Sequence, residues 1–594
     1  MPAGTPFSSR FPPGRFRAEF RGEVNVDVRE RYTFVVEGSG EAVLEVNGKT
    51  AWQGALAESA PGRSEPLRLK KGANQLLLRY ASPDSGDARV RLLWSTSEFR
   101  PEPIGPSVLS HEPLSAEDAG ARRGHAELLR LQCTACHADD RVPPATAPDL
   151  AGVGARLQPG WVYEWLMRPV RAGFAPRQMP HFFADDSEGR RAAADVAAHL
   201  ATLREGDGGD SVAPSEARQG GALFAQLGCI GCHHRPGDRV VDRTGLDHVA
   251  SKWFATALVS YLRAPQAHDP GASMPDFRLT APEAAALAAF LREGAADPTT
   301  PPPGDPARGR DLVDALGCAA CHALPQARKP SAPPWSAVAA RVGDHDLCGG
   351  PPAYPPGVDG ALLSGLVPVA LPLAQAAEES LRRLRCTACH ERDGVVDQWT
   401  QHSGEVSDLL PAAPADPAHP EVAQTRPSLT WAGEKLRAEA LQDVVAGTVE
   451  PRARPWLHAR MPGFAAHAAP IGAGLSCGHG MLEGVDAPAT SDEDVALGAT
   501  LVTTKMFACV TCHGVGPEPP VQVFEVQGVN FALVGRRLRP EYFLRWMRSP
   551  QRVDPGSKMP SYADARGKTA FTDVLGGDAE RQFGAIWSWI RSLR

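Results

Sequence analysis

The sequence has no hydrophobic run long enough to cross a lipid bilayer as a helix. Such a helix needs about 20 consecutive apolar residues, and the nearest candidate, GLVPVALPLAQAA at 365–377, is short and broken by Pro368 and Pro372. The first residues, MPAGTPFSSRFPPGRF, also lack the apolar core of a secretory signal peptide. We therefore expect no transmembrane segment, and no leader is visible.

Neither sign of charge dominates. The chain carries 62 Lys and Arg against 69 Asp and Glu, a formal net charge of −7 over 594 residues. No basic run and no stripe of basic and aromatic residues occurs in it, although these are the features that bind nucleic acids. The composition thus gives nucleic-acid binding little support.

Glycine and proline are abundant, with 58 and 56 residues. Both interrupt regular secondary structure, so we expect many short elements joined by loops rather than long helix bundles. A chain of 594 residues also exceeds the usual size of a single hydrophobic core. Length and composition together predict several small domains.

Ten of the twelve cysteines form five copies of one motif, Cys-x-x-Cys-His. The copies are Cys133-Cys136-His137, Cys229-Cys232-His233, Cys318-Cys321-His322, Cys386-Cys389-His390 and Cys509-Cys512-His513. Two thiols at this spacing lie on one helical turn and can bond to both vinyl groups of a haem, while the histidine reaches the iron. A zinc site would need further ligands converging on one metal, and a thioredoxin-type dithiol would lie in a βαβ context, which is absent. Five covalently attached haems c are the interpretation that the repetition favours.

The surroundings of the motifs repeat as well. A short amphipathic helix precedes the motif, as in GGALFAQLGCIGCH (220–233), and a proline turn with an apolar segment follows it, as in APDLAGVGARL (147–157). Next come an aromatic helix stopped by proline, such as WVYEWLMRP (161–169), a Met-Pro pair and a closing helix, such as PEAAALAAFLRE (282–293). This order of parts resembles the class I cytochrome c fold, and the resemblance covers roughly residues 115–594.

The resemblance implies five mainly α-helical cytochrome c domains. Their expected bounds are 115–205, 213–295, 305–375, 376–485 and 492–594, and the third domain is abbreviated. The links between them are short and rich in proline, so we expect semi-rigid spacers that hold neighbouring haems at fixed separations.

The resemblance also implies a methionine as the distal ligand of the haem iron. Four Met-Pro pairs follow a motif, and they lie 42, 41, 71 and 46 residues after its histidine. They begin at Met179, Met274, Met461 and Met559. An inserted loop between His390 and Pro427 stretches the third spacing. Met/His ligation leaves no open iron position and suits an electron carrier. In the family a proline carbonyl accepts a hydrogen bond from the motif histidine, which implies Pro148 for His137 and Pro427 for His390.

The third domain lacks a methionine between His322 and Cys386. Its distal position could be filled by His345, by a residue of another domain or by none, and an open iron could bind a ligand or peroxide. The two remaining cysteines, Cys348 and Cys477, could form a disulfide between the third and fourth domains or stay as free thiols.

Residues 1–105 contain no cysteine and follow another pattern. Apolar and polar residues alternate in ERYTFVVEGSGEAVLEVNGKTAWQG (30–54), where Asn47-Gly48 predicts a type I′ hairpin. EPLRLKKGANQLLLRYA (65–81) and ARVRLLWSTS (88–97) continue the pattern and predict an all-β sandwich. The segments resemble the protective-antigen-type β-domain, which implies a glycan or surface partner. EGSGEA stands where that family often carries a calcium-binding Asp-Asp pair, so a docking or structural role is the alternative.

Three interpretations of function follow. The first is a pentahaem c-type cytochrome that carries electrons between a donor and an acceptor protein and has no catalytic residue. The second is a haem enzyme, a peroxidase or small-molecule reductase, that uses an open third haem. The third is a glycan- or partner-binding module linked to an electron-transfer chain. Because haem is attached to such motifs after export, we expect a periplasmic or extracellular protein whose signal peptide is missing from this sequence.

Overall fold

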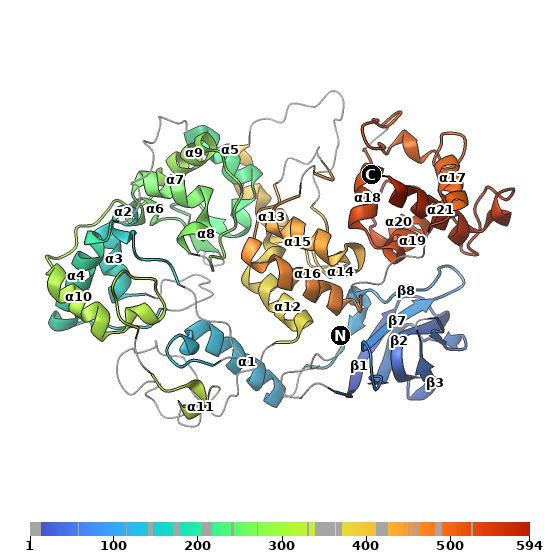
Figure 1. The fold of residues 1–594 in the computed structure, drawn as a ribbon, viewed down its shortest axis with the longest axis horizontal. Helices are drawn as coiled ribbons and strands as arrows, with labels where there is room; N and C mark the ends of the chain where they lie inside the picture. The colour runs from blue at the N-terminus through green and yellow to red at the C-terminus, as the bar shows by residue number, and fades with distance from the viewer. Residues whose placement is uncertain are drawn as a thin grey trace.

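The fold combines a β-sheet-rich N-terminal domain with a mainly helical remainder. The computed structural model describes residues 14–57, 59–113, 116–139, 147–169, 179–204, 217–238, 243–269, 271–329, 332–338, 363, 371–410, 426–449, 452–454, 460–481, 490–523 and 527–593. Figure 1 shows the helices in separate clusters along an elongated molecule, with the β-domain below the C-terminal cluster. Within these ranges, no helix has both the length and the apolar character to cross a membrane.

The β-domain is organised around one long strand, β2. Its strands are β1 (Arg17–Val26), β2 (Arg31–Val46), β3 (Lys49–Leu56), β4 (Gly62–Arg63), β5 (Leu67–Arg68), β6 (Gly72–Ala81), β7 (Arg89–Ser95), β8 (Glu102–Pro103) and β9 (Leu109–Ser110). The order along the sheet is β8-β7-β2-β6-β1-β9. The first half of β2 pairs with β7, β4 and β5, and the second half pairs with β6 and β3.

Two glycines allow β2 to change partners. Gly38 and Gly40 have positive φ angles of 146° and 99°, and a Cβ atom at Gly40 would lie 2.3 Å from the carbonyl oxygen of Ala81. Only glycine tolerates such an approach. The predicted hairpin is confirmed, because Asn47 and Gly48 between β2 and β3 both have positive φ, 50° and 74°.

Four helical units can be traced in the described parts of the chain, and each contains a pair of crossing helices. The pairs are α10 (Pro306–Ala315) with α4 (Ser187–Thr202), α5 (Ala217–Gln226) with α9 (Ala281–Arg292), α12 (Leu373–Arg383) with α16 (Ala468–Gly478), and α17 (Asp492–Leu501) with α21 (Ala579–Ser592). Glycine brings the two backbones together in every pair. A Cβ atom at Gly309, Gly220, Gly474 or Gly498 would lie 2.0, 2.0, 2.2 or 2.1 Å from a carbonyl oxygen of the other helix.

We name the units after their motif histidines. The His322 unit comprises residues 147–204 and 306–329, the His233 unit 217–295, the His390 unit 372–481 and the His513 unit 490–593. A further piece, the His137 segment, comprises 116–139 and 332–338. The other helices are α1 (Ala116–Leu131), α2 (Val153–Arg156), α3 (Pro159–Met167), α6 (Val249–Lys252), α7 (Ala255–Arg263), α8 (Pro265–His268), α11 (Trp335–Val338), α13 (Gln398–His402), α14 (Ala432–Lys435), α15 (Ala438–Ala446), α18 (Phe531–Arg537), α19 (Pro540–Arg548) and α20 (Pro550–Val553).

The first and third expected domains are assembled differently from the chain order. Residues 115–205 were expected to form one domain and 305–375 another. Instead, α10 packs against α4, and these two helices lie together at one end of Figure 1, away from α1. Both motifs are preceded by a similar apolar pattern, so spacing along the chain does not reveal which of the two helices packs against residues 147–204.

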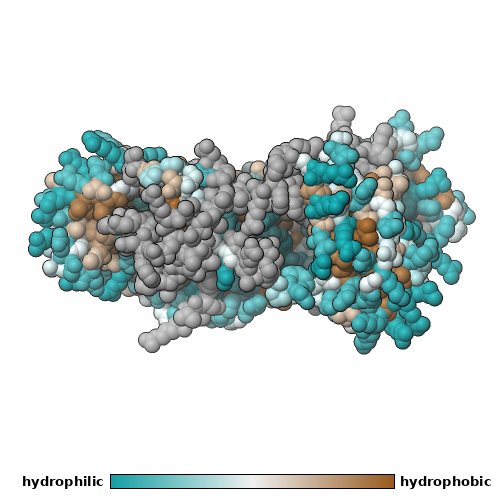
Figure 2. Space-filling model, turned by 90° about the horizontal axis from the view of Figure 1, so that it is seen from below, coloured by the Kyte–Doolittle hydropathy of each residue, from teal (hydrophilic) through white to brown (hydrophobic). Residues whose placement is uncertain are grey.

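Neighbouring units are joined by short backbone pairings. Leu157 of the His322 unit pairs with Trp253 of the His233 unit, and Leu436 of the His390 unit pairs with Leu538 of the His513 unit. These four residues occupy equivalent positions in their units, directly after α2, α6, α14 and α18. Figure 2 shows hydrophilic side chains over both ends of the visible face, with hydrophobic groups exposed among them.

Candidate functional site

All five Cys-x-x-Cys-His motifs adopt the same turn. The first cysteine opens a one-turn 3₁₀-helix: η2 (Cys133–Ala135), η3 (Cys229–Gly231), η4 (Cys318–Ala320), η7 (Cys386–Ala388) and η10 (Cys509–Thr511). The residue before it is left-handed in every copy: Gln132, Gly228, Gly317, Arg385 and Ala508 have φ between 54° and 71°. This conformation costs a non-glycine residue about 1–2 kcal/mol, so its recurrence at Gln132, Arg385 and Ala508 indicates a shared structural requirement. Both thiols of each motif lie on a single turn, as attachment to two vinyl groups requires.

The histidine that ends each motif has its Nδ1 atom next to a backbone carbonyl oxygen. Three of the pairs follow the chain order: His233 with Thr244 at 3.2 Å, His390 with Pro427 at 2.8 Å and His513 with Val529 at 2.7 Å. A proton held on Nδ1 leaves Nε2 free to bind a metal and fixes the ring. The expected contact between His390 and Pro427 is therefore present.

The two other histidines have exchanged partners. His322 Nδ1 lies 2.8 Å from the carbonyl oxygen of Pro148, and His137 Nδ1 lies 2.8 Å from that of Pro333. The expectation that Pro148 serves His137 is therefore wrong. The reason is the packing of α10 against α4, which brings the third motif, and not the first, next to residues 147–150.

Burial favours the neutral forms of four motif histidines and of several motif cysteines. It lowers the pKa of His233 to about 4 and lowers the pKa of His322, His390 and His513 as well. Burial also raises cysteine pKa values. They reach about 12 for Cys229, Cys386, Cys389 and Cys509, and about 11 for Cys318 and Cys321. Neutral imidazole is the metal-binding form, whereas thiols that stay protonated are poor redox nucleophiles.

Met179 and Met559 have matching surroundings. Trp165 Nε1 donates a hydrogen bond to the sulfur of Met179 at 3.3 Å, and Trp546 Nε1 donates one to the sulfur of Met559 at 3.0 Å. The two tryptophans lie in the aromatic helices α3 and α19. Sequence reasoning identified these helices but missed the tryptophans. The similar Trp-to-Met spacings, 14 and 13 residues, were the available signal.

Met274 and Met461 begin two loops that pair with each other. Asp276 N donates to the carbonyl oxygen of Gly463 at 3.2 Å, and Gly463 N donates to that of Asp276 at 2.8 Å. Arg278 Nη2 donates to the carbonyl oxygen of Met461 at 3.1 Å. The two Met-Pro loops therefore fix each other across the boundary between the His233 and His390 units.

The motif turns of these two units also touch. A Cβ atom at Gly231 would lie 2.6 Å from the carbonyl oxygen of Ala388, and both residues precede the second cysteine of their motif. Arg385 Nη1 donates to the carbonyl oxygen of Cys232 at 3.4 Å. The cysteine-bearing edges of the two units thus face each other.

The loop inserted after His390 strengthens this contact. It forms α13 and η8 (Ser403–Leu409), and its Trp399 and Val406 belong to the hydrophobic core of the His233 unit. The carboxylate of Glu405 pairs at 2.8 Å with Arg243, whose side chain is 1% exposed. The insertion that stretches the spacing to Met461 therefore joins two units.

Some expected site residues cannot be placed. His345 and Cys348 lie outside the described residues, so neither the distal role of His345 nor a disulfide with Cys477 is tested. Cys477 itself lies in α16. In the part of the chain that the structure describes, no group of three or more His, Cys, Asp and Glu side chains is arranged to hold a metal ion.

The residues fit a haem group. Between the His390 and His513 units, burial lowers the pKa of Lys435 to about 8, and Arg454 and Arg537 add to the effect, with Asp554 opposing it. Arg537 Nε is buried without a hydrogen-bond partner among the described residues. Such an excess of partly buried positive charge suits carboxylates, and haem carries two propionates. When bound, haem supplies one-electron redox chemistry at its iron.

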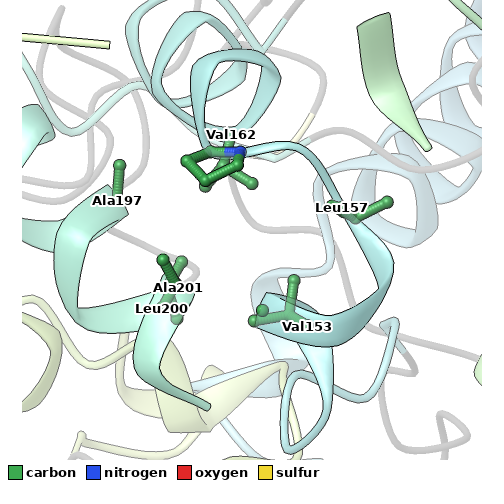
Figure 3. Close-up of a pocket in the computed structure, with 8 residues that line it drawn as sticks. Val153, Leu157, Val162, Ala197, Leu200 and Ala201 are labelled. Atoms are coloured by element: carbon green, nitrogen blue, oxygen red, sulfur yellow. The ribbon is translucent and has the colours of Figure 1, made fainter. Parts of the chain in front are cut away.

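A small pocket elsewhere does not bear on this chemistry. It lies between α2, α3 and α4, and its lining includes Val153, Leu157, Val162, Ala197 and Leu200 (Figure 3). All the residues that line it are apolar, and none is a motif residue or an expected iron ligand. We regard it as a packing defect of the His322 unit.

Residues 217–295 match the family model for cytochrome c. No curated protein matches the chain. Similar solved structures include an anti-sigma factor domain-containing protein from Clostridium clariflavum (18% identity, TM-score 0.15), covering 17% of this chain and 34% of that one. The match to a second anti-sigma factor domain-containing protein (19% identity, TM-score 0.16) covers 18% of this chain and 40% of that one. The match to a PA14 sugar-binding domain from an RTX adhesin (18% identity, TM-score 0.16) covers 17% of this chain and 57% of that one. This chain thus spans less than two thirds of each of these structures, and such low scores carry no argument about its fold or function.

Proposed function

We propose that this protein is a pentahaem c-type cytochrome that carries electrons between extracytoplasmic redox partners. The observation that carries the proposal is the repetition of one arrangement: a 3₁₀ turn with two cysteines, followed by a histidine whose Nδ1 lies against a backbone carbonyl. The match of residues 217–295 to cytochrome c supports haem-based electron transfer for one copy. The other four copies share its local geometry.

The chain's own residues have distinct tasks in this proposal. Each cysteine pair ties one haem to the backbone, and each motif histidine is the proximal ligand. Met179, Met274, Met461 and Met559 are the distal ligands. Because a methionine occupies the remaining iron position, these four sites exclude small ligands and favour simple electron transfer. The two partners of the protein would then be a redox donor and a redox acceptor.

The β-domain has a structural role in this proposal. Its Arg91 pairs with Glu434 of the His390 unit at 3.3 Å, and its Glu102 pairs with Arg552 of the His513 unit. Arg552 also lies 3.9 Å from the ring centroid of Phe99. These contacts support a domain that fastens the last two helical units together.

The test is the haem content of the covalent chain. The protein is produced with a secretion leader in a host that attaches haem c, denatured and weighed, and its haem is quantified by absorbance. We expect the mass of the polypeptide plus five haems. Cys229→Ala/Cys232→Ala is expected to lose one haem, whereas Cys477→Ala loses none and serves as the matched control. A denatured chain that weighs no more than its amino acids would refute the proposal.

A further inference from the structure

We infer that the first and third motifs have exchanged their downstream halves, so that Met179 ligates the haem iron held by His322 and not the one held by His137. This inference rests on the proposed function, because it concerns the ligands of attached haems. Chain order assigns Met179 to His137, which lies 42 residues before it. Four sets of contacts contradict that assignment.

The first set joins the third motif to residues 147–150. His322 Nδ1 lies 2.8 Å from the carbonyl oxygen of Pro148. Two residues further on, Leu150 N donates to the carbonyl oxygen of Ala323 at 3.0 Å. In the His390 unit the same histidine contact is made to Pro427, which belongs to that unit's own distal half. Pro148 and the residues after it therefore form the distal half for His322.

The second set joins α10 to α4. A Cβ atom at Gly309 would lie 2.0 Å from the carbonyl oxygen of Asp195, which reproduces the glycine crossing between the motif helix and the closing helix of the His233 and His513 units. The carboxylate of Asp195, 4% exposed, pairs with Arg308 at 3.0 Å and accepts from Asp305 N at 2.7 Å. Helix α10 thus occupies the place of the motif helix in this unit.

The third set places Met179 in that unit. Met179 and Cys318 pack against the same hydrophobic core, to which α4 contributes Val196 and α10 contributes Val313. In the His513 unit, Met559 and Cys509 belong to one core in the same way. The distal methionine and the first cysteine of a motif thus share a core in both units.

The fourth set gives the first motif other neighbours. His137 Nδ1 lies 2.8 Å from the carbonyl oxygen of Pro333, and Trp335 N donates to that of Ala138 at 3.2 Å. Cys133 packs with Trp335, which is 2% exposed. The first motif therefore builds on residues 332–338, which follow the third motif in the sequence.

The experiment counts ligand-accepting haems in the full chain. Replacing a distal methionine by alanine opens one iron to cyanide, which is titrated spectroscopically. We expect Met179→Ala to add one cyanide-binding haem to the wild-type protein and to a Cys133→Ala/Cys136→Ala background. In a Cys318→Ala/Cys321→Ala background it is expected to add none. Met559→Ala is the matched control and should add one in all three backgrounds.

The reverse pattern, in which the effect of Met179→Ala disappears with the first motif's haem, would overturn the inference. An effect that survives in both backgrounds, or is absent from the wild-type chain, would overturn it too. If the alanine variant does not fold, Met179→His keeps the position filled, and the added bis-histidine haem signal in electron paramagnetic resonance is counted in the same backgrounds. Loss of every attached haem from the wild-type chain would instead refute the proposed function itself.

Discussion

Glu434 offers the sharpest test of how the domains are held together. Its carboxylate is 3% exposed and pairs with two arginines from other domains, Arg91 of the β-domain at 3.3 Å and Arg545 of the His513 unit at 2.8 Å. Arg545 also lies 4.4 Å from the ring centroid of Trp431. Replacing Glu434 by leucine leaves two largely buried cations facing an apolar side chain.

The loss of stability depends on which interaction partners Arg91 and Arg545 keep when Glu434 is replaced. Arg91 keeps a second partner, Glu37, at 3.5 Å, whereas Arg545 keeps only its aromatic contacts among the interactions described. Removing one partner of a buried ion pair typically costs about 3–5 kcal/mol, because the other charge stays uncompensated. We therefore expect Glu434→Leu to lower the free energy of unfolding of the domain assembly by about 3–5 kcal/mol. Glu434→Gln can still accept hydrogen bonds and should cost less.

The assay is urea unfolding of the intact chain, followed by tryptophan fluorescence. Loss of the carboxylate should shift the unfolding transition of the domain assembly to a lower urea concentration. Glu379→Gln is the control, since its pair with Arg382 lies on a half-exposed face of α12 and such pairs contribute about 0–1 kcal/mol. If Glu434→Leu unfolds like this control, the ionic contact does not hold the domains together.

Two further predictions concern helix packing and pH. Gly498→Ala should destabilise the His513 unit by about 1–3 kcal/mol, because its Cβ would lie 2.1 Å from the carbonyl oxygen of Ala585. The control is Gly584→Ala, whose Cβ would meet nothing within 4 Å and which should be neutral or stabilise the unit by about 0.5–1 kcal/mol. Thermal unfolding of the two variants compares these effects. The ion pair with Arg460 lowers the pKa of Glu283 from 4.5 to about 2, so its contribution is complete above pH 4.5 and is lost as the pH falls towards 2. The difference in stability between wild type and Glu283→Gln should therefore shrink over that range, and a constant difference would contradict the assignment.

The sequence was sufficient for features that depend on neighbouring residues. The five motif turns and the hairpin at Asn47-Gly48 arise within short stretches whose residue types restrict the backbone. The contact between His390 and Pro427 spans 37 residues and was expected from the resemblance. The roles of Trp165 and Trp546 were within reach by the same reasoning, since each lies at a similar distance from its methionine. Local patterns therefore predicted the turns that carry the motif residues.

The assignment of Pro148 to the wrong histidine had a different origin. Separation along the chain assigns a proline to the motif that precedes it, and His137 is the motif histidine that precedes Pro148. What decides the matter is contact between α10 and α4, in particular Gly309 against the carbonyl of Asp195 and the pairing of Asp195 with Arg308. These interactions join residues more than a hundred positions apart, and no spacing rule orders them.

The exchange also changes the order in which the haems would follow one another. The His322 unit contacts the His233 unit through Leu157 and Trp253, and the His390 unit contacts the His513 unit through Leu436 and Leu538. The intervening junction, between the His233 and His390 units, is made by motif turns that touch at Gly231 and Ala388.

Near the first and third motifs, burial raises the pKa of Cys321, and Cys136 adds to the effect. The three junctions that join the His322, His233, His390 and His513 units therefore alternate between two kinds of face. The exchanged halves thus place the motif of His322, and not that of His137, in the unit that pairs with the His233 unit through Leu157 and Trp253.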